Sequence, residues 1–157
     1  MPVAQTKYFG CLDYSPESVF DFPAGLPAFE NQDQFLFLEA QQYAPLVFLQ
    51  SLRTPGLCFL ALPVQVIDPN YELAVSEEDR RALALDPARQ LVQGVEVLAL
   101  ALLSFGGETS ASANLMAPII VNLATRRALQ AIRWDARYSH QQAIPALAAR
   151  RTEDRAC

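Results

Sequence analysis

Phe22-Pro23-Ala24-Gly25-Leu26-Pro27-Ala28-Phe29 interrupts a run of apolar, strand-forming segments that extends from Thr6 to Phe59. The two prolines fix φ, Gly25 permits a positive φ, and the flanking phenylalanines can anchor a tight loop in a core. We therefore predict a structural loop between two strands of a small β protein. A partner-binding role for the same loop is the alternative.

Short β-forming runs recur along the chain with turn signals between them. This spacing is typical of a sandwich or a barrel. The sequence predicts a mainly β, antiparallel, single-domain fold over residues 1–140, either barrel-like or a sandwich. The predicted strands are Thr6–Tyr14, Val19–Phe22, Gln34–Glu39, Leu46–Ser51, Leu57–Leu62, Val92–Ser104, Ile119–Leu123 and Ala128–Trp134.

In two of these runs the odd-numbered and the even-numbered positions are both apolar. Phe35-Leu36-Phe37-Leu38 and Val97-Leu98-Ala99-Leu100-Ala101-Leu102 fit strands that are covered on both faces, or a buried helix. Valine content, Gly94 and a hairpin turn at Gly106-Gly107 favour a strand for the second run. Five phenylalanines are predicted to be largely buried: Phe22, Phe29, Phe37, Phe48 and Phe59.

One short helix is predicted from Ser76 to Ala84. Ser76 is a candidate N-cap, and Glu77-Glu78-Asp79 place acids in the first turn, where unpaired N–H groups and the helix dipole favour them. Asp86-Pro87 would end the helical stretch. The alanine- and arginine-rich tail, residues 141–157, is predicted to be a short helix or frayed.

The amino terminus, the apolar runs and the cysteines indicate the cellular location to expect. The amino terminus lacks a basic region followed by an apolar one, and the longest apolar run, Val97–Leu103, is far shorter than the ~20 residues of a membrane-spanning helix. Cys11, Cys58 and Cys157 are widely spaced and form no CxxC pair, so Cys58 is predicted to be a small core residue. We expect a reducing, cytoplasmic location and no membrane span.

Charge is distributed unevenly around a net value of −5. Residues 1–108 contain fourteen acids and five basic residues, and the whole chain has one lysine. Such a chain lacks the cationic face that phosphate neutralisation requires, so direct nucleic-acid binding is disfavoured. A basic protein partner suits it better.

Catalytic patterns are weak. A serine triad needs a histidine, and the single one, His140, lies beside the tail without a GxSxG motif, so we predict that it faces solvent. Helix capping explains Glu77-Glu78-Asp79, and the chain has neither a Walker loop nor a GxGxxG motif. The sequence therefore predicts no catalytic, cofactor-binding or metal-ligating residues.

An ordered set of motifs resembles the flagellar assembly factor family called FliW over about residues 6–140. Two departures are Ala28, where the family usually has glycine, and Arg126-Arg127-Ala128, which replaces a lysine- and glycine-rich turn. The matching motifs are Thr6-Lys7-Tyr8-Phe9-Gly10, Phe22-Pro23-x-Gly25-Leu26, Leu49-Gln50-Ser51 with Pro55, Leu57-x-Phe59, Pro69-x-Tyr71-Glu72, Asn114-Leu115-Met116-Ala117-Pro118-Ile119-Ile120-Val121-Asn122 and Tyr138-Ser139.

The resemblance implies a non-enzymatic protein that binds flagellin in the cytoplasm and also binds the RNA-binding translational regulator CsrA. While flagellin is inside the cell, it would bind the factor and leave CsrA free to repress flagellin translation. Export of flagellin would release the factor, which would then antagonise CsrA so that translation resumes. We expect a monomer when the protein is free. The alternatives are a small β-barrel enzyme or cofactor binder, and a structural subunit of a larger assembly.

We call the stretch from Asp68 to Asp79 the acidic segment. A basic partner such as CsrA should be steered there, and Tyr71 would serve as an amphipathic anchor at the interface. The alternative is that these acids solvate a loop and cap a helix. The partner-binding hypothesis comprises Asp68, Tyr71, Glu72, Glu77, Glu78 and Asp79.

Overall fold

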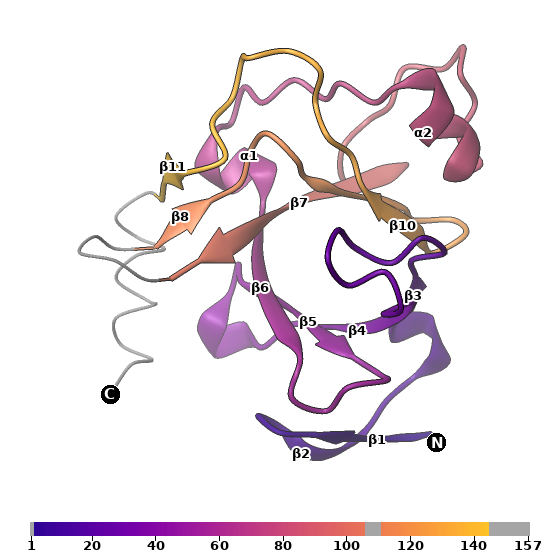
Figure 1. Ribbon diagram of the computed structural model, residues 1–157, viewed down its shortest axis with the longest axis vertical. Helices are drawn as coiled ribbons and strands as arrows, with labels where there is room; N and C mark the ends of the chain where they lie inside the picture. Colours follow the sequence, from indigo (N-terminus) through magenta and orange to yellow (C-terminus); the bar gives the residue numbers. More distant parts are fainter. Residues whose placement is uncertain (1, 106–110, 145–157) are drawn as a thin grey trace.

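Seven strands close into a barrel in the computed structural model, which describes residues 2–105 and 111–144 (Figure 1). Around the barrel the order is β7-β6-β5-β4-β3-β10-β9, and β9 pairs again with β7. Of the two predicted architectures, the barrel is therefore confirmed. The strands are β3 (Val19–Asp21), β4 (Gln34–Leu38), β5 (Val47–Ser51), β6 (Cys58–Pro63), β7 (Val97–Ser104), β9 (Ile119–Asn122) and β10 (Arg127–Gln130).

The pairing of β10 with β3 is parallel, whereas the other pairings between named strands are antiparallel. Arg127 of β10 lies opposite Asp21 of β3, and the Asp21 amide donates to the carbonyl of Arg126 over 2.8 Å. The prediction of an antiparallel sheet is wrong at this one contact. The two strands are far apart in the sequence and run in the same direction, so no hairpin pattern could indicate their pairing.

The two runs that are apolar at both parities are strands covered on both faces, as predicted. On β7, Leu98, Leu100 and Leu102 point into the barrel core, whereas the alternating residues from Val97 to Leu103 face a second cluster outside the barrel. On β4, Phe35 points inward and Leu36 is also fully buried on the opposite face.

The second cluster, the outer core, lies between β7 and the long connection from β6 to β7. This connection carries α1 (Val64–Ile67) and α2 (Glu77–Ala82) and runs over the top of the barrel (Figure 1). Ser76 caps α2 as predicted, because its hydroxyl accepts from the Asp79 amide over 3.0 Å. Leu83, just after α2, is buried, and its carbonyl accepts from the Asn122 side chain over 2.7 Å, which fixes α2 against β9.

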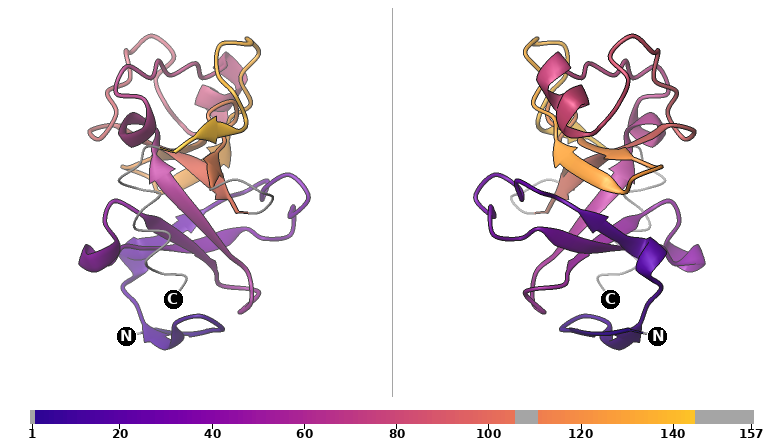
Figure 2. Two further views of the ribbon diagram at one scale, coloured as in Figure 1. Left: turned by 90° about the vertical axis from the view of Figure 1, so that its left-hand side faces the viewer. Right: turned by 90° about the vertical axis from the view of Figure 1, so that its right-hand side faces the viewer.

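The amino-terminal run is a hairpin rather than the single predicted strand Thr6–Tyr14. Strands β1 (Val3–Thr6) and β2 (Gly10–Asp13) pair only with each other, and both side views place them at the end opposite the helices (Figure 2). The hairpin is tied to the barrel by the Lys7 amide, which donates to the Pro55 carbonyl, and by an edge-to-face contact between Phe9 and Phe48.

Several short elements depart from the predictions. Strand β7 begins at Val97 and not at Val92, because residues 92–96 form a turn in which the Val92 carbonyl accepts from the Glu96 amide. The turn predicted at Gly106-Gly107 and the tail beyond residue 144 lie outside the described residues. Elements that the sequence analysis missed are α1, β8 (Ser112–Ala113), β11 (Gln142–Ala143) and the 3-10 turns Pro16–Ser18 and Gln41–Tyr43.

The loop between β3 and β4 has the predicted glycine conformation but not all of the predicted burial. Gly25 has φ +65°, and a Cβ there would lie 2.6 Å from backbone atoms of Phe29 and Glu30. Ala28 also has a positive φ, 70°. Phe29 is 36% exposed and packs edge-to-face on Phe59, so its predicted burial is wrong.

The other predicted phenylalanines are buried or half-buried. Phe22 and Phe48 are buried, whereas Phe37 and Phe59 are half-buried against the barrel core. Cys58 is half-buried rather than a full core residue, and His140 is exposed as predicted. Within the described ranges, no helix is long and apolar enough to cross a membrane.

Candidate functional site

Tyr71, the proposed aromatic anchor of the acidic segment, belongs to the outer core. It is 4% exposed, and its hydroxyl donates to the carbonyl of Leu115 over 2.7 Å. Burial is the main reason why the pKa of Tyr71 is raised. The structure therefore buries this ring, and its role as a partner-binding anchor stays a prediction. A single aromatic residue among acids can equally well be the point where a loop is fastened to the core.

Arg133 fastens the acidic segment from the other side. Its side chain is 2% exposed, and its Nε and Nη2 donate to the two carboxylate oxygens of Asp135, each over 2.9 Å. Its Nη1 donates to the Glu72 carbonyl over 2.6 Å. The guanidinium also lies 4.7 Å from the ring centre of Tyr138 and 5.4 Å from that of Tyr71. We call these five residues the Arg133 cluster.

A bidentate guanidinium–carboxylate pair combined with ring contacts requires arginine geometry, because lysine offers one charged point and no planar fork. The hydrogen bond from Arg133 is the main reason why the pKa of Asp135 is lowered. Arg133, Asp135 and Arg137 were not predicted from the sequence. The structure buries Ala131 and Arg133 and exposes Ile132 and Trp134, whereas an arginine beside two large apolar residues is normally assigned to the surface.

Glu72 is held at its main chain and exposed at its side chain. Its amide donates to the Tyr138 hydroxyl over 3.1 Å, and its carboxylate accepts from Arg137 over 2.5 Å. That hydrogen bond is the main reason why the pKa of Glu72 is lowered. Because the two side chains are 65% and 50% exposed, the pair is a surface contact that a charged partner could replace.

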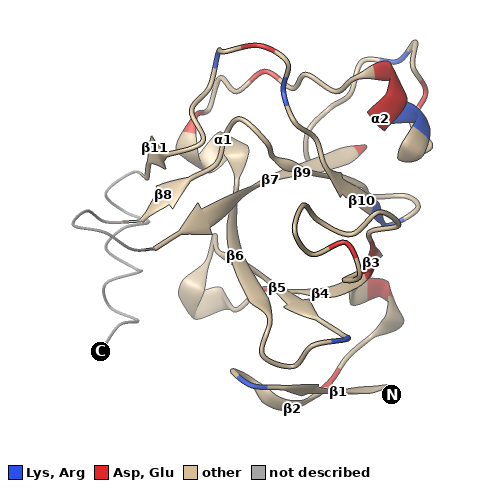
Figure 3. Ribbon diagram, viewed as in Figure 1, with Lys and Arg blue, Asp and Glu red and all other residues tan. Residues whose placement is uncertain are grey.

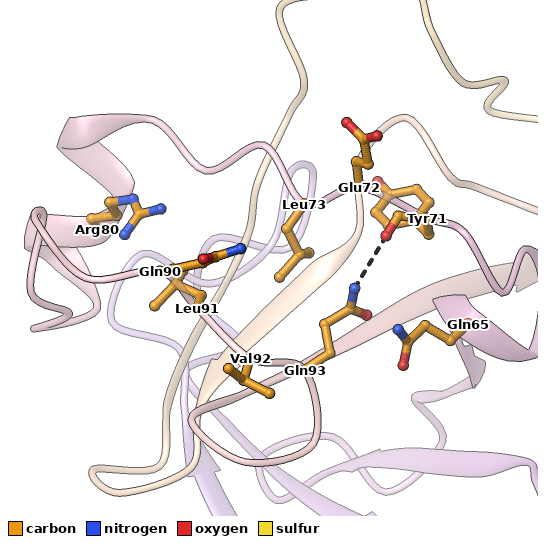
Figure 4. A pocket seen from close by; sticks show the side chains of 9 residues that line it. All are labelled: Gln65, Tyr71, Glu72, Leu73, Arg80, Gln90, Leu91, Val92 and Gln93. Atoms are coloured by element: carbon orange, nitrogen blue, oxygen red, sulfur yellow. Dashed lines mark hydrogen bonds between the residues drawn. The ribbon is translucent and has the colours of Figure 1, made fainter.

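A cleft of about 630 Å³ opens beside Tyr71 (Figure 4). One wall is formed by residues 71–73 and the other by residues 90–93, and the Gln93 side chain spans the gap by donating to the Tyr71 carbonyl over 3.3 Å. Hereafter "the cleft" means this space. The lining residues are Gln65, Tyr71, Glu72, Leu73, Arg80, Gln90, Leu91, Val92 and Gln93.

The remaining acids of the acidic segment lie on or near α2. Glu77 and Glu78 are exposed, and Glu77 pairs with Arg81 one turn later over 3.2 Å. Asp68 accepts from the Asn70 amide and shapes the turn that precedes Tyr71. Acidic and basic residues gather on the connection and on the segment after β10 (Figure 3), whereas the strands β4, β5, β6, β7, β8 and β9 themselves contain none.

The structure thus places Tyr71 and Glu72 at the cleft, and Glu77 and Glu78 on helix α2, whose Arg80 also lines it. Within the described part of the chain, no group of three or more His, Cys, Asp or Glu side chains could hold a metal ion. The cleft contains one carboxylate, one guanidinium, three amides and apolar side chains. The lining therefore offers hydrogen-bond donors and acceptors beside apolar surface.

These features define a small closed-barrel protein with a cleft built on its outside by one long connection. The chain belongs to the FliW family, because the sequence model of that family, described as FliW protein, matches residues 3–144. It is 32% identical over 142 residues to a flagellar assembly factor FliW of Bacillus subtilis, covering 90% of this chain and 96% of that protein.

Two further comparisons agree. A flagellar assembly factor FliW of Azoarcus sp. is 31% identical over 129 residues, which cover 82% of this chain and 88% of that protein. A crystal structure of the flagellar assembly factor FliW superposes with a TM-score of 0.77 at 26% identity, covering 90% of this chain and 95% of that chain.

Proposed function

We propose that this protein is a non-enzymatic flagellar assembly factor that binds flagellin and the translational regulator CsrA in the cytoplasm. The observation that carries the proposal is membership of the FliW family over residues 3–144. Flagellin and CsrA would be alternative partners, so that the amount of free flagellin sets how much factor is available to antagonise CsrA.

Charge supports a basic partner on the side of the molecule that carries α2. Residues 65–96 contain seven acids and three arginines, a net charge of −4 out of −5 for the whole chain. An RNA-binding protein must present cationic surface. Exposed acids such as Glu72 and Glu78 would increase the rate at which this partner associates more than they increase the affinity of the complex. Charges at the rim of an interface act mainly by attracting the partner before contact.

The experiment compares two double variants in binding to immobilised CsrA at several salt concentrations. Glu72→Lys/Glu78→Lys reverses charge on the proposed face. Asp13→Lys/Glu39→Lys makes the same change in net charge at exposed positions on β2 and after β4. We expect the first variant to associate at least about tenfold more slowly and with a flatter salt dependence, and the control to lose much less.

Equal losses in the two variants would assign the effect to net charge and not to this face. Immobilised flagellin, in place of CsrA, tests whether the protein also binds flagellin. Pre-mixing the protein with excess flagellin should prevent its capture by CsrA. Simultaneous binding of both partners at saturation would contradict the partner exchange.

A further inference from the structure

The walls of the cleft are main-chain segments that are not paired with each other. Residues 71–73 and 90–93 belong to no named helix or strand, although Gln93 forms an isolated bridge with Val97. Among the described residues, no backbone–backbone hydrogen bond joins the two walls; the contact across the gap is the Gln93 side-chain amide on the Tyr71 carbonyl. Both main-chain groups of Glu72 and both of Val92 are already bound elsewhere. Within the described residues no hydrogen bond engages the main chain of Leu73 or Leu91, so these groups can serve a ligand.

The walls are nevertheless held in place. Arg133 and Tyr138 bind the carbonyl and the amide of Glu72, and Tyr71 is fixed to Leu115. On the other side, Arg80 donates to the carbonyls of Asp86 and Arg89, which ties the loop before residue 90 to α2. A cleft between preorganised walls loses little conformational entropy when it is filled.

Two kinds of side chain in the cleft lining match two parts of a polypeptide, its main chain and an apolar side chain. Gln65, Gln90 and Gln93 each carry both a donor and an acceptor, which is what a peptide main chain needs. Leu73, Leu91 and Val92 provide an apolar surface for a side chain. The volume of about 630 Å³ lies within the roughly 300–1,000 Å³ range of ligand sites.

Charge decides the kind of polypeptide. Glu72 lies at the mouth of the cleft, and Glu77 and Glu78 are exposed on the adjoining helix. Arg80 is the one cation in the lining, and its Nη1 is already engaged by two carbonyls. A lysine or arginine of a ligand can replace Arg137 on Glu72, since that pair is exposed and weak.

We propose that the cleft binds an extended, cationic segment of the basic protein partner. The main chain of that segment would bind the glutamine amides, an apolar side chain would cover Leu91 and Val92, and a basic side chain would reach Glu72. This inference rests on the proposed function, in which the basic partner is CsrA, and it adds where and in what conformation the partner is bound.

The test fills the cleft without disturbing the core. Val92 lines the cleft and is 50% exposed, so Val92→Trp places an indole in the space that the segment needs. Val95 is 71% exposed, lies in the same turn and lines a neighbouring hollow instead, so Val95→Trp is the matched control. Gln90→Trp, at an exposed position on the same wall, is an independent second variant.

We expect Val92→Trp and Gln90→Trp to weaken CsrA binding at least tenfold, equivalent to about 1.4 kcal/mol, and Val95→Trp to change it less than twofold. In wild type, CsrA should slow amide hydrogen exchange at residues 72–75 and 90–93. Thermal unfolding of all three variants reports whether they fold like wild type.

Wild-type affinity in both cleft variants would overturn the inference, and so would equal losses in all three variants. Loss of flagellin binding with CsrA binding retained would overturn the assignment of a cationic occupant. If wild type itself does not bind CsrA, the proposed function fails and the inference falls with it. That failure is seen before any variant is compared, so the two failures are distinguishable.

Discussion

Arg133 donates from Nη1 to the main-chain carbonyl of Glu72 over 2.6 Å, although 61 residues separate them in the sequence. The same guanidinium holds both carboxylate oxygens of Asp135 and lies against the rings of Tyr71 and Tyr138. One buried cation therefore sets the position of a wall of the cleft relative to the segment that follows β10. The exposed carboxylate of Glu72 is presented from this fixed main chain.

We expect Arg133→Gln to be strongly destabilising. Asp135 is 37% exposed and can be solvated without Arg133, but the part-buried Glu72 carbonyl would lose its donor, which typically costs about 1–3 kcal/mol, and the packing of the guanidinium on two rings would be lost as well. Urea unfolding measures the change. Arg137→Gln, which removes an exposed guanidinium from the neighbouring pair, is the control and should cost less than about 1 kcal/mol. Similar costs for the two variants would show that the Arg133 cluster is not a structural centre.

Asp135 should make unfolding depend on pH in the acidic range. Its pKa is lowered in the folded protein by the Arg133 hydrogen bond, so the unfolded chain binds more protons and stability rises with pH in this window. The contribution is complete above the unfolded value, about 4, and is lost as the pH falls through the lower folded value.

Urea midpoints measured from about pH 6 downward to below 4 should therefore fall less steeply for Asp135→Asn than for wild type. Asp13→Asn, at an exposed aspartate outside the cluster, should follow the wild-type curve. Parallel curves for wild type and Asp135→Asn would contradict the assignment.

The two phenylalanines that flank the loop between β3 and β4 should differ in their effect on stability. Phe22 is fully buried in the barrel core, so Phe22→Ala should cost about 3–5 kcal/mol if the site cannot collapse. Phe29 is 36% exposed, so Phe29→Ala should cost less than half as much. Equal losses of the free energy of unfolding would mean that the exposed ring is as important to the core as the buried one.

Ala28 is a position where glycine should be better. Its φ of 70° costs a residue with a Cβ roughly 1–2 kcal/mol, while glycine loses about 0.5–1 kcal/mol more backbone entropy on folding. Ala28→Gly should therefore stabilise the protein by up to about 1 kcal/mol. Ala24→Gly, in the same loop but without a positive φ, should be neutral or destabilising. Calorimetric melting of both variants measures the difference.

Local sequence information predicted the elements whose causes lie within a few residues. Ser76 caps α2 because its hydroxyl needs to reach only as far as the Asp79 amide. The bend before β9 has an equally local cause, because the Asn114 side chain accepts from the amides of Met116 and Ala117. The unbroken apolar run in β7 predicted burial on both faces of the strand, because successive side chains of a strand point to opposite faces.

The amino-acid sequence was enough to predict a β domain with a short capped helix and an acidic segment, and to identify its family. The burial of Tyr71, its contact with Arg133 and the cleft between residues 71–73 and 90–93 became apparent from the packing of the folded chain. These features depend on contacts between segments 20 to 60 or more residues apart. Such contacts arise from how the chain packs, and burial of a charged or polar side chain depends on partners that no local pattern specifies.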